Sequence, residues 1–134
     1  MNWGVFVAAI ASFIFGWLFY SNVLFGPLWL KLSKIDKKEQ KEMASSPMAG
    51  RMITALISSI VTAWVLLFFM GKLTINSYSG AIPLVFKIWL GFLVSTTLIG
   101  GVLWENKSVK LFFLNSIYWL LNLIIISFVL LSFY

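Results

Sequence analysis

The chain of 134 residues is 61% hydrophobic and only 10% charged, and it carries a net charge of +6. About 25% of the residues of an ordinary soluble domain are charged, so this composition indicates an integral membrane protein. The chain has no His and no Cys, which excludes disulfides, zinc sites built from nitrogen and sulfur ligands, and Ser-His or Cys-His nucleophilic pairs. We therefore expect no metal, no cofactor and no enzymatic activity.

Four apolar stretches are each long enough to cross a hydrocarbon core of about 30 Å, which takes about 20 helical residues. Transmembrane β-strands alternate apolar and polar residues, and these runs do not. We expect an all-α fold, a polytopic membrane protein whose residues 1–134 form a single domain with four transmembrane helices in a bundle. The expected spans are residues 3–25, 52–70, 82–103 and 111–134.

Pro and Gly mark the breaks between these spans. Gly26-Pro27 is expected to end or kink the first helix, because Pro lacks a backbone N–H and clashes with the preceding turn. Ser46-Pro47 is expected to begin the second helix as N-cap and first helical residue, and Pro83 suits the first turn of the third. A Lys-rich loop at about 31–50 lies between the first two spans. The first span has no basic N-terminal region, so we expect a retained helix rather than a cleaved signal peptide.

The basic residues predict the orientation in the membrane. Eight of the ten Lys and Arg follow the first and third spans: Lys31, Lys34, Lys37, Lys38, Lys41, Arg51, Lys107 and Lys110. The positive-inside rule places loops 26–51 and 104–110 in the cytoplasm and both termini outside. Acidic residues are interspersed in the Lys-rich loop, which favours a solvated cytoplasmic segment over a surface for anionic lipid headgroups. No basic and aromatic platform for nucleic acid is present.

Small residues recur every fourth position in the first span, at Gly4, Ala8, Ser12 and Gly16. This spacing places them on one helix face, where another helix can approach closely. We expect this helix-packing face to pack inside the bundle. The alternative is homo-oligomerisation or docking to a partner in a larger membrane complex.

A polar strip is expected on the fourth helix, where Asn115, Tyr118 and Asn122 follow at i, i+3 and i+7 and therefore share a face. An amide as deep as that of Asn122 should avoid lipid and find a partner. The possible partners are Ser12, Ser58, Ser59, Thr62, Ser95, Thr96 and Thr97. Hydrogen bonding between helices is the favoured interpretation, and the lining of a ligand cavity is the alternative.

Glu105 is the one acidic residue outside the Lys-rich loop. We expect it to pair with Lys107, Lys110 or Arg51 near the membrane surface, as exposed carboxylates commonly do. The alternative is a site at the cytoplasmic end of the bundle.

The chain resembles the small bacterial membrane proteins grouped as domain of unknown function 1761 (DUF1761). The resemblance lies in the opening Met1-Asn2-Trp3, in the aromatic and Gly residues that follow, and in the second half of the chain. Its distinguishing residues are Glu105, Asn115 and Tyr118. It implies four helices and a location in the bacterial inner (plasma) membrane, and it implies no reaction or substrate.

Three functions compete on this basis. The leading hypothesis is a non-enzymatic accessory or scaffold subunit, because the chain is small and lacks catalytic chemistry. The second is a small-solute transporter or channel formed by a homo-oligomer. The third is a protein that binds a lipid or another apolar ligand, with the polar strip lining a pocket beneath Trp119 and Trp64.

Overall fold

The computed structural model describes residues 3–21, 23–33 and 48–133, and over these ranges it contains helices and no strand. The all-α prediction is therefore confirmed. The helices are α1 (Trp3–Phe19), α2 (Gly26–Ser33), α4 (Met48–Lys72), α5 (Tyr78–Ile88) and α7 (Val109–Leu131). Between α5 and α7 the chain continues without a break through the π-helical η1 (Trp89–Val94), the short α6 (Ser95–Thr97) and the π-helical η2 (Leu98–Trp104).

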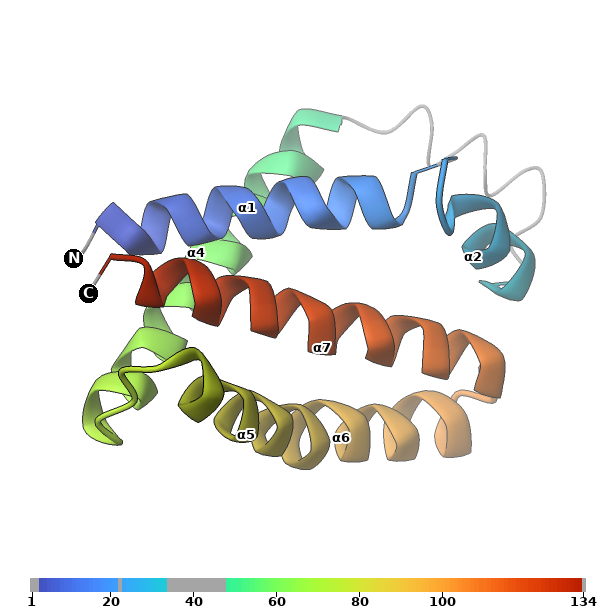
Figure 1. The fold of residues 1–134 in the computed structure, drawn as a ribbon. Helices are drawn as coiled ribbons and strands as arrows, with labels where there is room; N and C mark the ends of the chain where they lie inside the picture. The colour runs from blue at the N-terminus through green and yellow to red at the C-terminus, as the bar shows by residue number, and fades with distance from the viewer. Residues whose placement is uncertain (1–2, 22, 34–47, 134) are drawn as a thin grey trace.

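Helix α7 is the centre of the arrangement (Figure 1). It lies between α1 on one side and the long helix of residues 78–104 on the other, and α4 crosses obliquely behind α1 and α7. The core joins all of these elements and includes Ala8, Leu66, Met70, Val85 and Ile126. The outer faces of α4 and of the 78–104 helix remain apolar and exposed, as expected where lipid tails surround a helix.

Three of the helices are long and apolar enough to cross a membrane: Ala49–Lys72, Tyr78–Trp104 and Val109–Leu131. The fourth, α1, is apolar but has only 17 residues. Along the described chain, the architecture fits a multi-pass membrane protein.

Helix α1 ends at Phe19 and not at the expected residue 25. The backbone N–H of Ser21 bonds to the carbonyl of Leu18, and those of Phe25 and Gly26 bond to the carbonyls of Phe19 and Ser21. These bonds close a turn and satisfy the carbonyls at the helix end. Gly26-Pro27 consequently begins α2 rather than ending α1, and Pro27 lies in the first turn, where its missing N–H costs nothing.

The loop expected at 31–50 is shorter than predicted, because α2 continues to Ser33 and α4 begins at Met48. The remaining positions, 34–47, lie outside the described residues. The prediction that Ser46-Pro47 begins the second helix falls among them.

The third helix begins earlier than residue 82, because the Ser77 hydroxyl caps it by accepting a 3.1 Å hydrogen bond from the Gly80 N–H. Pro83 therefore lies inside α5 and not in its first turn. Hydroxyl groups also bond within the π-helical part: Ser95 donates to the carbonyl of Leu90 at 2.9 Å. Such bonds compete with the regular backbone hydrogen bonds of an α-helix. Here they occur where the helix changes from α-helical to π-helical.

Candidate functional site

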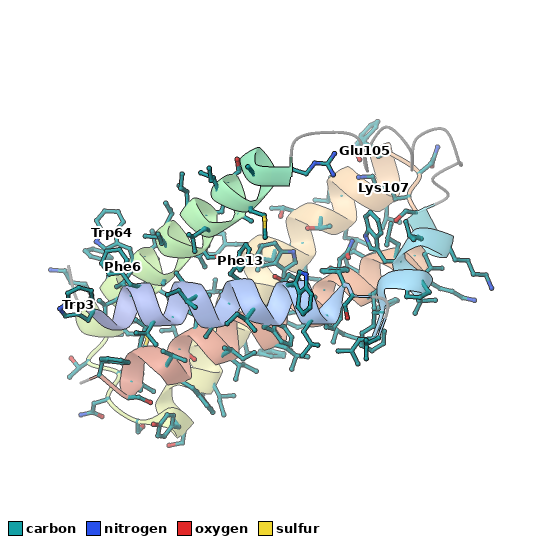
Figure 2. The ribbon with its side chains drawn as sticks, turned by 90° about the horizontal axis from the view of Figure 1, so that it is seen from above. Trp3, Phe6, Phe13, Trp64, Glu105 and Lys107 are labelled. Carbon is teal, nitrogen blue, oxygen red and sulfur yellow. The ribbon has the colours of Figure 1, made fainter. Side chains whose placement is uncertain are left out.

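A groove of about 490 Å³ lies between α1, α4 and α7. Small-molecule sites in proteins commonly measure about 300–1,000 Å³. Figure 2 shows how it arises: α1 and α4 meet at the end where Trp3, Phe6 and Trp64 lie and then diverge, and Phe13 lies in the widening space between them. The groove is therefore a consequence of the oblique crossing of α4.

One face of α4 forms a wall of this groove. Its residues recur at helical spacing, which places them on one side of the helix; they are Arg51, Met52, Ala55, Ser58, Ser59 and Thr62. Arg51 and Thr62 are separated by about 16 Å along the helix axis, at 1.5 Å per residue. The wall is thus long, with a cation at one end and three hydroxyl side chains toward the other.

The polar floor of the groove is a hydrogen bond between α1 and α7. The Ser12 hydroxyl donates to Oδ1 of Asn122 at 2.6 Å, and both side chains line the groove. Asn122 is only 2% exposed, so its partner satisfies an amide that would otherwise be buried without one. Ser12 is one of the partners predicted for Asn122.

The other two residues of the polar strip contact α1 or the residue that follows it, Tyr20. The Tyr20 hydroxyl donates to Oδ1 of Asn115 at 2.7 Å. The Tyr118 ring stacks on Phe15 with a centroid distance of 5.5 Å, and it lines the groove while Asn115 does not. The strip therefore fixes α7 against α1 along its length, and two of its three members also face the groove.

The small-residue face lies inside the bundle. Gly4, Ala8 and Ser12 are buried, and α1 packs on both α4 and α7. Gly16 lies so close to α7 that an added Cβ would be 2.7 Å from the Tyr118 hydroxyl. This is the placement expected for packing within the chain, and Ser12 and Gly16 additionally line the groove.

Glu105 takes no part in the groove. Its Oε2 forms an exposed ion pair with Nζ of Lys107 at 2.9 Å. Pairing with Lys107 is one of the three expected arrangements, and the structure shows neither of the other two within the described residues. Asn106 between them has a positive φ of 53°, a conformation that Asn tolerates better than most residues at a helix end.

The sequence predicts only some of the residues that line the groove. Trp119 lines the groove, whereas Trp64 does not. Arg51 and the α4 hydroxyls were not identified as parts of one surface, although Ala55, Ser58, Ser59 and Thr62 recur at helical spacing in an apolar span. That spacing is the signal from which the wall could be found.

The Ser12–Asn122 bond is open to a direct test. We expect Asn122→Leu to lower the free energy of unfolding by about 1–2 kcal/mol, because the buried Ser12 hydroxyl loses its acceptor in a membrane interior. The measurement is unfolding in mixed detergent and dodecyl sulfate micelles, followed by circular dichroism. In a Ser12→Ala background, Asn122→Leu should lower the free energy of unfolding by clearly less. An equal loss in both backgrounds would show that Ser12 and Asn122 are not coupled.

Comparisons with known proteins complete the description. A family model described as "Protein of unknown function (DUF1761)" matches residues 3–131, nearly the whole chain. No curated protein and no solved structure matches it.

Proposed function

The chain belongs to the DUF1761 family, whose function is unknown, and we propose that it is a multi-pass membrane protein that holds one amphipathic molecule in the groove between α1, α4 and α7. The observation that carries this proposal is the groove itself. Its walls are mostly apolar, and hydrogen-bonding side chains converge on its floor. Ligand sites of membrane and soluble proteins alike combine these two properties.

The groove opens sideways, toward the surrounding lipid. The exposed fractions of three of its lining side chains are 68% for Trp17, 45% for Met52 and 40% for Trp119. An apolar or amphipathic molecule dissolved in the bilayer can therefore enter without crossing water. Entry from the bilayer favours a ligand that is itself a membrane component.

The chemistry of the lining supports binding rather than catalysis, so we propose a non-enzymatic role. The groove offers hydroxyls, one amide and one guanidinium, and within the described part of the chain its lining contains no carboxylate, thiol or imidazole. General acid–base and nucleophilic catalysis usually draw on those missing groups.

The accessory subunit and the homo-oligomeric transporter have no comparable observation in their favour. The surface that suggested docking to another chain was the small-residue face of α1. Three of its four residues are buried against the other helices, so that face is not available to a partner. The ligand-binding hypothesis is the one that a candidate site, the groove between α1, α4 and α7, supports.

We also propose that α1 crosses the membrane with the three longer helices, and that the end of the bundle carrying α2 faces the cytoplasm. Lys31 on α2, Lys107 before α7 and Lys110 in the first turn of α7 support this orientation through the positive-inside rule. The start of α1 and the end of α7 lie together at the opposite end (Figure 1), so the proposed orientation puts both outside. The proposed location is a bacterial inner (plasma) membrane.

A matched pair of variants on α4 tests the ligand site. Ala55 lines the groove, whereas Ile57 is 56% exposed and does not line it. We expect the wild type and Ile57→Phe to keep one bound small molecule when extracted gently from the membrane. Ala55→Phe should lose that molecule from most of the protein, because the new ring occupies its space.

Native mass spectrometry of the intact protein measures this loss, with circular dichroism confirming that both variants are folded. Retention of the same molecule by folded Ala55→Phe would overturn the proposal. So would a wild type that carries no small molecule at all.

A further inference from the structure

We infer that the occupant of the groove is a single anionic phospholipid, whose phosphate lies at Arg51 and one of whose acyl chains lies along the apolar wall. This inference rests on the proposed function, and it adds the chemical class of the ligand. It is carried by a cation and two hydroxyl groups that have no partner among the described residues, and by the dimensions of the groove.

Arg51 is the cation of the groove. Within the described ranges, the ion pair is that of Lys107 with Glu105, and Arg51 forms none. Among the lining residues that the structure describes, no carboxylate neutralises it. A guanidinium presents a planar set of donors that matches a phosphate with two parallel hydrogen bonds. The charge and its geometry therefore favour an anionic phosphate over a neutral or cationic head.

Two hydroxyl groups, those of Ser58 and Ser59, lie about two turns farther along the same wall. Thr54 and Thr62 donate to the carbonyls of Gly50 and Ser58, one turn earlier. Among the residues described, the side chains of Ser58 and Ser59 form no such bond, although both line the groove. A hydroxyl left without a partner in apolar surroundings is costly.

A glycerophospholipid supplies what those hydroxyls lack. Its ester oxygens accept hydrogen bonds, and they lie between the phosphate and the acyl chains. With the phosphate held by the Arg51 guanidinium at one end of the groove, the esters and then the acyl chain follow along the wall toward Ser58 and Ser59. The order of groups along the groove, cation first and then hydroxyls, is the order of groups along the lipid.

The remaining surface suits one chain of such a lipid. Phe13, Trp17, Met52 and Trp119 supply apolar and aromatic walls. The volume of about 490 Å³ is that of a single small-molecule site. The sideways exposure of Trp17 and Trp119 leaves room for the second chain to remain in the bilayer.

The test compares two lipids with identical acyl chains, dioleoylphosphatidylglycerol and dioleoylphosphatidylcholine, titrated into detergent-solubilised full-length protein. Native mass spectrometry measures the affinity of the first bound lipid. We expect the wild type to prefer the anionic lipid about fivefold, corresponding to about 1 kcal/mol for one basic residue near the headgroup. Arg51→Gln should bring the two affinities together.

Lys31→Gln is the matched control, because Lys31 is an exposed cation on α2 that does not line the groove. We expect it to keep the preference. Ser58→Ala combined with Ser59→Ala should weaken both lipids equally and leave their ratio unchanged, because the esters are common to both.

Each contrary result has a separate meaning. Equal binding of the two lipids by the wild type, or an equal loss of preference in Lys31→Gln and Arg51→Gln, would overturn the anionic assignment and leave the groove as a ligand site. Failure of both lipids to bind, while a small molecule of another mass is displaced by Ala55→Phe, would also overturn the anionic assignment and leave the groove as a ligand site. A dimer that covers the groove and carries no lipid would overturn both proposals.

Discussion

Replacing Gly26 with Ala should lower the free energy of unfolding by about 3 kcal/mol, the largest effect expected from any single methyl group in this chain. A Cβ at this position would lie 2.7 Å from the carbonyl oxygens of both Tyr20 and Ser21. These atoms belong to the backbone of the turn that connects α1 with α2. They cannot move away as the end of a side chain would, so the turn itself must open.

The measurement for Gly26→Ala is unfolding in mixed micelles, with Gly50→Ala as the control. Nothing lies within 4 Å of a Cβ built at Gly50, which is inside α4, so Ala there should leave stability unchanged or raise it by up to about 1 kcal/mol. A loss in Gly26→Ala no greater than in Gly50→Ala would show that the turn is looser than the structure indicates.

Gly16→Ala should cost about 1–3 kcal/mol, and Tyr118→Phe should remove most of that cost. The Cβ of Ala at position 16 would lie 2.7 Å from the Tyr118 hydroxyl but 3.5 Å from the ring carbon that carries it. The second distance is an ordinary van der Waals contact. The clash therefore arises from one oxygen atom, which Phe lacks.

A double-mutant cycle isolates this contact. The four proteins are the wild type, Gly16→Ala, Tyr118→Phe and the double variant, and their free energies of unfolding are compared in the same micelles. We expect the cost of Gly16→Ala to be smaller by at least about 1 kcal/mol in the Phe background. Equal costs in both backgrounds would mean that Gly16 is required for a reason other than the approach of Tyr118.

The sequence predicts the long helices well because their signal is local. Long, predominantly apolar runs identify α4, the 78–104 helix and α7, since the helix is the structure that satisfies the backbone of a lone segment in lipid. The ends are less predictable, because they depend on single side chains. Ser77 starts α5 before Pro83, and a set of turn bonds ends α1 at Phe19 before Gly26-Pro27 is reached.

In the site, too, some features can be predicted from the sequence and others cannot, as the polar strip and the groove show. The spacing on one helix predicts that Asn115, Tyr118 and Asn122 share one side of α7, and Ser12, one of the partners expected for Asn122, donates a hydrogen bond to it. The groove depends instead on the oblique crossing of α4, which no single helix encodes. Arg51 could therefore be predicted as a residue at the membrane surface but not as part of a ligand site.

The length of α1 has a consequence for the bilayer itself. Its 17 residues span about 26 Å, less than the hydrocarbon thickness of about 30 Å. A short span is accommodated by thinning of the adjacent lipid leaflet or by preference for a thin membrane. If α1 crosses as proposed and the mismatch falls at its Phe19 end, lipid headgroups are drawn inward beside the wide end of the groove. The shortness of one helix would then lower the barrier for a lipid to leave the bilayer sideways.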